Sequence, residues 1–198
     1  MSIDLVSVDD GVWANLTAAT QSRAHDLRYL SMATLSQDQV PVSRLLVLRD
    51  VHPSERMLIF HTDVLSDKWL ELSNHPKASI LGFNANISEQ IRFQGQVELF
   101  AEGTKINQSE WDKLSIWSKN TYCGGPPGDA ANPPQLEEQK DVELPSDEQL
   151  AQGRSRFGVI QFKVDKLDWF RLQRSDNRRA KFSYDRSGNV EKSAWINP

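Results

Sequence analysis

Three cations and an expected helix start lie close together in the sequence and could bind a phosphate. Arg44 and Arg49 fall on one alternating apolar segment, and Lys68 follows Ser66 by two residues where a helix is expected to begin. A guanidinium binds phosphate oxygens through paired hydrogen bonds, and the free N–H groups of a helix N-terminus favour anions. The pattern predicts a site for a phosphorylated cofactor or substrate beside a sheet.

The two arginines are expected to have different roles. They lie five positions apart, so a regular strand places Arg44 and Arg49 on opposite faces of its sheet. One arginine would hold the phosphate, and the other would reach a ring or the edge of a substrate. Strand periodicity alone leaves a second interpretation open, in which both arginines lie at the surface of a barrel and bind nothing.

These residues need a sheet to position them, and the hydrophobic pattern predicts short antiparallel strands. Strands are expected at 30–35, 41–51, 57–62, 78–84, 90–100, 157–164, 169–172, 181–184 and 190–195. Helices are expected at 10–29 (one helix or two short ones), at 65–73 with Ser66 as the N-cap, and at 105–118 with Trp111 and Trp117 in the apolar stripe. Many short strands with few helices favour a small barrel over a parallel α/β sheet.

The composition is typical of one soluble domain spanning residues 1–198. Of its 198 residues, 38% are hydrophobic and 25% charged, which is enough for a single core. No run of eighteen apolar residues occurs and the N-terminus lacks a leader pattern, so we expect no membrane segment and a cytoplasmic location. The single cysteine, Cys123, excludes an internal disulfide and a cysteine-rich metal cluster.

An acidic, proline-rich stretch interrupts the pattern at 124–148 and is expected to be a long loop inserted in the domain. Positions 124–150 hold seven acids against one base, and five of the nine prolines fall there. Without this stretch the remaining chain is slightly basic, although the whole chain has a net charge of −4. The loop could be a lid, but a charge run is more often only a solvated face.

Common catalytic and nucleotide-binding motifs are absent from the sequence. There is no GxGxxG after a strand, no GxxxxGK[ST], no GxSxG, no HExxH and no CxxC, and the four histidines lack the spacing of metal ligands, so no metal is expected. A basic run at 171–181, interleaved with aromatic residues, could be a nucleic-acid patch. The acidic net charge favours a small phosphorylated ligand instead, so no nucleic-acid partner is expected.

The sequence resembles a known family over most of 32–195, and most strongly over 42–99. The matching segments, in order, are VSRLLVLRDV, FHTDVLSDKW, SEQIRFQGQVEL, IWSKNT and LDWFRL. They resemble the pyridoxine (pyridoxamine) 5′-phosphate oxidase family. The resemblance implies a mainly β fold, namely a six-stranded antiparallel split barrel with flanking helices, acting as a homodimer with FMN at the interface.

The resemblance also assigns cofactor-binding residues position by position. Arg44 and Lys68 would bind the FMN phosphate, and Ser66 belongs to the same FMN-binding motif. The backbone and side chains of Leu46, Val47, Leu48 and Arg49 would lie along the isoalloxazine with His61 and Thr62 beside it. Gln90 matches a flavin-contacting glutamine, Asn120 and Thr121 match a Gln-Ser pair near the phosphate, Phe170 (or Trp169) matches a tryptophan against the flavin, and Lys181 matches a late arginine.

Several positions depart from the family pattern. Arg49 replaces a lysine, Asp67 replaces an arginine that helps to hold the phosphate, and His61 replaces a tyrosine. Asn177-Arg178-Arg179 stands where the family places Arg-x-His against the vitamin B6 substrate, and the Tyr and Arg that grip the substrate phosphate have no match at 110–117. The FMN site is therefore better supported than the identity of the substrate.

The resemblance implies an FMN-dependent oxidoreductase. Pyridoxamine or pyridoxine 5′-phosphate would be oxidised, with transfer to flavin N5 and then to oxygen, and Arg49 and Arg179 are the candidate substrate contacts. No catalytic acid or base is expected. Two alternatives stay open: a flavin- or haem-binding protein without oxidase activity, and an FMN-dependent reductase of another substrate.

Overall fold

The computed structural model describes residues 4–129, 144–174 and 176–198. Its helices are α1 (Leu5–Gln21), α2 (Asp67–Asn74), α3 (Lys105–Asp112), α4 (Ile116–Asn120) and α5 (Asp147–Arg156), with 3-10 turns η1 (Asp26–Arg28) and η2 (Pro53–Glu55). Its strands are β1 (Tyr29–Leu35), β2 (Pro41–His52), β3 (Met57–Asp63), β4 (Lys77–Asn84), β5 (Glu89–Phe100), β6 (Phe157–Arg171), β7 (Arg178–Tyr184) and β8 (Val190–Ile196). None of the helices in these ranges has the length and apolar character needed to span a bilayer.

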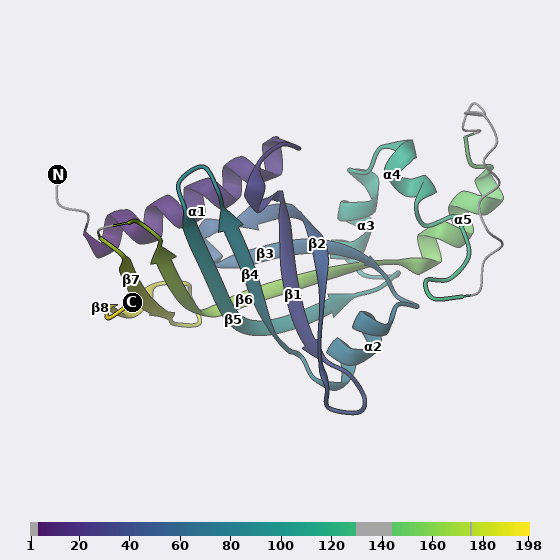
Figure 1. Cartoon of the computed structure of the whole chain (residues 1–198). Helices are drawn as coiled ribbons and strands as arrows, with labels where there is room; N and C mark the ends of the chain where they lie inside the picture. Colours follow the sequence, from purple (N-terminus) through teal and green to yellow (C-terminus); the bar gives the residue numbers. More distant parts are fainter. Residues whose placement is uncertain (1–3, 130–143, 175) are drawn as a thin grey trace.

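Six strands close into an antiparallel barrel, which confirms the predicted fold class. The order is β3-β2-β1-β4-β5-β6, and β3 pairs again with β6 to complete the ring. Strands β7 and β8 continue the sheet beyond the barrel from the second half of β6. In Figure 1, α1 lies beside this extension and α3, α4 and α5 gather at the other end of the molecule.

Strand β6 serves both parts of the sheet because it bends at a bulge. Its first half pairs with β3 and its second half with β7, and the register with β5 shifts between Gln94 and Gly95, leaving Asp165 as the extra residue. A Cβ on Gly95 would lie 2.0 Å from the Lys163 carbonyl oxygen. The bend therefore requires glycine at position 95.

The barrel interior is filled by the apolar side of each alternating strand. Leu30, Met32, Leu48, Phe60 and Phe93 are fully buried there. Each such side chain contributes about 1.5–3 kcal/mol when it leaves water. Trp13 and Leu16 of α1 belong to the same cluster, so α1 is part of the core rather than a peripheral helix.

A buried ionic clamp fixes α1 to the C-terminal strands. Asp9 lies 2.8 Å from Arg56 Nη2, and the Tyr184 hydroxyl donates a hydrogen bond to Asp9. The Arg56 guanidinium stacks over the Trp13 and Tyr184 rings at 5.2 and 4.8 Å. Burial, and then the nearby Asp9, raise the pKa of Tyr184, which keeps its hydroxyl protonated as a donor.

A second apolar cluster lies outside the barrel, between β3, β6 and α3. It contains Ile59, Trp111, Tyr122, Phe157 and Val159. Asn107 of α3 is fully buried and donates hydrogen bonds to the carbonyl oxygens of Phe100 (2.9 Å) and Phe157 (2.7 Å). These bonds hold α3 against β5 and β6, where it covers the outer face of β3.

Four expectations about individual elements were wrong. The helix expected at 105–118 is two helices, because the Ser115 hydroxyl accepts a hydrogen bond from the Ser118 N–H and caps a new helix. Trp117, which was expected in the apolar stripe, is exposed. The strands expected at 157–164 and 169–172 are one strand, continuous through the bulge.

The other two concern helix starts. The loop expected at 124–148 ends earlier, because a capping box between Ser146 and Gln149 starts α5. Most of that loop, 130–143, lies outside the described residues. Ser66 occupies the N-cap position of α2, but its hydroxyl donates to the Asp63 carbonyl oxygen at 2.6 Å and does not cap the helix.

Candidate functional site

The expected phosphate-binding residues converge where β2 and β3 meet the start of α2. Lys68 donates from Nζ to Thr62 Oγ1 at 3.1 Å, and the Thr62 and Ser66 hydroxyls lie 3.3 Å apart. Arg44 is close enough to Lys68 to contribute, after burial, to a lowered pKa of the Lys68 ammonium. This arrangement, which we call the cradle, comprises Arg44, Thr62, Ser66 and Lys68.

Glu71 is a member of this region that was not expected from the sequence. Its carboxylate is buried, lies 2.7 Å from Arg44 Nη2 and accepts a hydrogen bond from Thr34. Arg44 therefore already has a carboxylate partner, whereas the only side-chain partner of Lys68 among the described residues is the neutral Thr62 hydroxyl. The only signal in the sequence is that Glu71 lies one turn after Lys68 on α2.

Arg49 lies on the opposite side of β2 from Arg44. Arg44 lies an even number of residues from Leu46 and Leu48, whose side chains are in the barrel core, whereas Arg49 directly follows Leu48 and so faces outward. Arg49 is also the extra residue at a bulge between Leu48 and Asp50. Leu46 and Leu48 thus offer a ligand only their backbone, which corrects the expectation for their side chains. Within the described residues Arg49 makes no ion pair, and its buried Nε has no hydrogen-bond partner.

His61 lies near Arg49 on the outer side of β3. Its side chain is only 4% exposed, Nε2 is 3.1 Å from Glu110 Oε2, and Nδ1 is buried without a partner among the described residues. The ring packs edge-on against Phe157 at 4.9 Å. Two buried polar atoms, Arg49 Nε and His61 Nδ1, are thus unsatisfied in one region, which is typical of a site that is completed by a ligand.

The electrostatics of the His61–Glu110 pair assign a proton to one ring nitrogen. The hydrogen bond from His61 lowers the pKa of Glu110 to about 2, while burial lowers the pKa of His61 despite that carboxylate. Both directions fit a neutral imidazole that donates Nε2–H to an ionised Glu110. His61 Nδ1 is then left as a hydrogen-bond acceptor.

Asn120 and Thr121 lie at the end of α4, on the side of the barrel that carries the outer apolar cluster. Thr121 Oγ1 donates to the Ser118 carbonyl oxygen at 2.7 Å, and the next residue, Tyr122, packs against Phe157. The Arg49 charge acts on Tyr122, which places this segment near Arg49 and His61. Among the described residues, no hydrogen bond joins Asn120 or Thr121 to the cradle, and the Thr121 hydroxyl is used within its own helix.

The remaining expected residues form a second group on the outer face of β5, β6 and β7. The strand register places Gln90, Phe170 and Arg179 in one row, with Lys181 exposed two residues further along β7. Phe170 faces outward beside Gln90, whereas Trp169 is 1% exposed in the core, so Phe170 is the residue available to a flavin. Arg179 is already paired with Asp168, at 2.9 and 2.7 Å.

One chain does not bring the two groups together. The first group lies on β2, β3 and α2, and the second begins on β5, with β1 and β4 between β2 and β5 in the sheet. Both groups adjoin β6 but at different points along it. His61 on β3 faces Val159 of β6, whereas Gln90 on β5 faces Phe170 of β6, eleven residues further on. Each group is therefore half of the expected site.

The fold and the residue pattern define an FMN-binding split barrel. Residues 11–101 match the family described as pyridoxamine 5′-phosphate oxidase, FMN-binding domain. Over this segment, a little under half of the chain, the sequence is similar to the pyridoxamine 5′-phosphate oxidase-like family, and FMN is the cofactor that this match supports.

Among curated proteins the chain is 26% identical to pyridoxine/pyridoxamine 5′-phosphate oxidase 2 of Arabidopsis thaliana, over 86% of this chain and 87% of that protein. It is 34% identical to the pyridoxine/pyridoxamine 5′-phosphate oxidase of Thermosynechococcus vestitus, over 42% of this chain. That match spans only 38% of the relative's own length, so the activity of the whole relative does not transfer with it.

Solved structures agree on the fold. A pyridoxamine 5′-phosphate oxidase-related, FMN binding protein from Nostoc punctiforme superposes with a TM-score of 0.73 and 21% identity, covering all of both chains. PhzG from Burkholderia lata, solved in complex with tetrahydrophenazine-1-carboxylic acid, superposes with a TM-score of 0.65 and 20% identity, covering 96% of this chain and 91% of that chain.

The residues present fit FMN. The cradle offers a lysine, an arginine and two hydroxyls at the start of α2, which suits a phosphate. Arg49 Nε and His61 Nδ1 supply one unsatisfied donor and one unsatisfied acceptor, which suits the polar edge of a flavin ring.

We predict that Glu110→Gln removes part of the acid sensitivity of folding. The folded-state pKa of Glu110 is depressed from 4.5 to about 2, so its contribution to stability is present above pH 4.5 and is lost as pH falls towards 2. Urea unfolding across this pH range should show that the free energy of unfolding falls less steeply with pH in the variant than in the native chain. The control variant is Asp112→Asn, which changes an exposed neighbouring carboxylate. If the free energy of unfolding falls as steeply with pH in Glu110→Gln as in Asp112→Asn, the depressed pKa of Glu110 is contradicted.

Proposed function

We propose that this protein is an FMN-dependent oxidoreductase whose FMN phosphate is bound by the cradle. The observation that carries the proposal is the convergence of Lys68, Arg44 and Thr62 at the start of α2. The same two strands, β2 and β3, carry Arg49 and His61, whose buried Nε and Nδ1 have no hydrogen-bond partner among the described residues. Bound FMN would accept a hydride, or its two-electron equivalent, from a substrate carbon. The protein's own residues orient the ring, hold its phosphate and supply the surrounding charge.

The functional unit proposed is a homodimer that completes each site across its interface. Each chain carries two half-sites, and a second copy could place Gln90, Phe170 and Lys181 against the other copy's cradle and Arg49. Large apolar side chains lie exposed on the outer face of the strands between the half-sites. They are Tyr29 (53% exposed), Leu45 (67%), Leu81 (44%) and Phe83 (48%). An exposed apolar patch of this kind is typical of an interface.

Pyridoxamine or pyridoxine 5′-phosphate is the leading substrate. The family match supports it, and Arg49 supplies a guanidinium with no ion-pair partner among the described residues for the substrate's anionic group. Arg179 is the weaker substrate contact, because Asp168 already holds it by two hydrogen bonds.

A second candidate is an FMN-dependent oxidoreductase with a different, planar anionic substrate. Asn177 stands where the family pattern has arginine, and the Arg179 side chain is paired with Asp168. The similarity to PhzG, whose complex holds an aromatic carboxylate, is in line with this option. A flavin carrier without turnover is the third alternative.

The oxidase proposal predicts turnover of pyridoxamine 5′-phosphate by the FMN-loaded protein, measured as oxygen consumption with formation of the aldehyde. Arg49→Ala should raise KM by about tenfold or more, because a charge-assisted contact contributes about 1.5–3 kcal/mol. Arg23→Ala, which removes an exposed arginine that belongs to neither half-site, is the control. If protein fully loaded with FMN does not oxidise pyridoxamine 5′-phosphate, the oxidase proposal is ruled out. The oxidoreductase with another substrate and the flavin carrier would then remain.

The cradle predicts distinct effects of three substitutions on FMN affinity, measured by quenching of flavin fluorescence. Lys68→Ala should weaken binding by about 1.5–3 kcal/mol and Arg44→Ala by about 2–4 kcal/mol, since both remove a charge-assisted phosphate contact. Glu71→Gln should tighten binding, because it removes a carboxylate from beside the phosphate. Unchanged affinity in Lys68→Ala and Arg44→Ala would refute the cradle.

The dimer proposal predicts that Leu81→Glu dissociates the protein and weakens FMN binding in the same concentration range. A carboxylate on the apolar outer face meets its symmetry mate or its neighbours in a dry interface, which is unfavourable. Sedimentation velocity measures the mass, with Val6→Glu, an exposed apolar residue on α1, as the control. If the native chain is monomeric and still binds FMN fully, the proposal of a site shared between two copies is contradicted, whereas the proposal for the cradle is not affected.

A further inference from the structure

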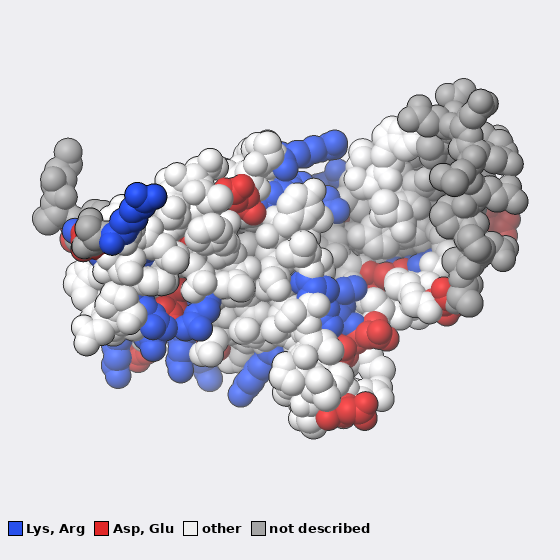
Figure 2. Space-filling model, viewed as in Figure 1, with Lys and Arg blue, Asp and Glu red and all other residues white. Residues whose placement is uncertain are grey.

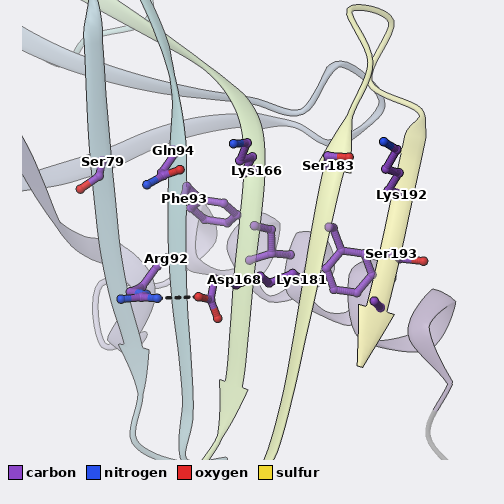
Figure 3. Close-up of a pocket in the computed structure, with 13 residues that line it drawn as sticks. Ser79, Arg92, Phe93, Gln94, Lys166, Asp168, Lys181, Ser183, Lys192 and Ser193 are labelled. Atoms are coloured by element: carbon purple, nitrogen blue, oxygen red, sulfur yellow. Dashed lines mark hydrogen bonds and ion pairs between the residues drawn. The ribbon is translucent and has the colours of Figure 1, made fainter. Parts of the chain in front are cut away.

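A groove of about 540 Å³ runs across the outer face of β4 to β8 (Figure 3). Strands β5 to β8 pair in sequence along this face, and the bulge at Asp165 in β6 lies within it. A volume of this size is within the range of pockets for small molecules. Figure 2 shows Lys and Arg side chains gathered along the lower left of the molecule, over these strands.

The charge of the groove is strongly one-sided. Four cations line it, namely Arg92, Lys166, Lys181 and Lys192, against one carboxylate, Asp168. That carboxylate is already occupied by two arginines, Arg92 and Arg179. The three lysines form no ion pair with any described residue, so their charges are available to a ligand.

The strand register places two of the lysines on either side of a serine. Lys166 on β6 faces Ser183 on β7, which in turn faces Lys192 on β8. Neighbouring strands lie about 4.8 Å apart, so these two flexible ammonium groups can converge on one anion above Ser183. The Ser183 hydroxyl is buried without a hydrogen-bond partner among the described residues. Gln94 and Ser79 extend the same row across β5 and β4.

We propose that this groove binds a small polyanion, a molecule with at least two anionic groups whose simplest form is a diphosphate. Lys166 and Lys192 hold one anionic group over Ser183, and Lys181, one row away, reaches a second. The groove includes Lys181, which also belongs to the half-site with Phe170, but it shares neither cations nor strands with the cradle. A ligand here therefore binds alongside FMN and does not replace its phosphate.

Isothermal titration of the FMN-loaded protein with pyrophosphate, at fixed ionic strength, tests the proposal. The native chain should bind saturably, the double variant Lys166→Ala/Lys192→Ala should bind about tenfold more weakly or worse, and Ser183→Ala should show a smaller loss. The control Arg23→Ala/Lys105→Ala removes the same charge from exposed positions elsewhere and should bind as the native chain does.

Two results would overturn the proposal that the groove binds a polyanion. One is that the native chain shows no saturable binding of pyrophosphate, and the other is that the control variant loses as much affinity as Lys166→Ala/Lys192→Ala. Loss of the flavin absorbance in Lys166→Ala/Lys192→Ala would also overturn it, because the lysines would then belong to the FMN site. Failure of the native chain to hold FMN at all counts against the proposed function and not against the groove. A parallel titration with citrate decides whether carboxylates satisfy the groove as well as phosphates do.

Discussion

The bend in β6 is the constraint on which the rest of the molecule depends. The strand must leave β3, with which it closes the barrel, and then accept β7 on the same edge. It can do so because Asp165 is an extra residue and because Gly95 on β5 lets the Lys163 carbonyl approach where any side chain would clash. Phe170 and Arg179 lie beyond the bulge, on the part of the sheet that has left β3 and His61, and Lys166 and Lys192 line the groove on that same part.

Charge pairing separates the structural cations from those available to a ligand. Arg56 is committed to Asp9, Arg156 to Asp63, and Arg171 to Glu89, each with a largely buried carboxylate. Arg44 is intermediate, since Glu71 balances its charge beside the proposed phosphate position. Lys68 and Arg49 have no carboxylate partner among the described residues, so their charges are the least compensated of those named here.

The sequence predicted the barrel well because alternation reports burial directly. The strands β1 to β5 lie within one or two residues of the expected ranges, and the opposite orientations of Arg44 and Arg49 follow from parity. The alternation of buried and exposed residues did not reveal the bulge at Asp165, because a bulge depends on how the strand pairs with its partner. The capping box at Ser146 was a readable signal for α5 that was overlooked among the surrounding acids.

Sequence patterns could assign a predicted site residue to a strand or helix, but they could not identify the side chains that it contacts. Glu71 and Glu110 carry no motif, and only the packing of α2 and α3 against the barrel brings them to Arg44 and His61. The separation of Gln90 and Phe170 from the cradle is likewise a property of the closed sheet. Local pattern specifies which face a residue occupies, whereas contacts between distant segments require the tertiary fold.

The clamp between Asp9 and Tyr184 joins residues 175 positions apart. During synthesis, α1 leaves the ribosome long before its partner strand exists, so Asp9 and the apolar side of α1 stay uncovered while the rest of the chain is made. Barrel closure has the same character, since β3 waits for β6. Nearly the whole chain must be present before its two ends can be tied, and such non-local topology makes folding slow relative to helical proteins of this size.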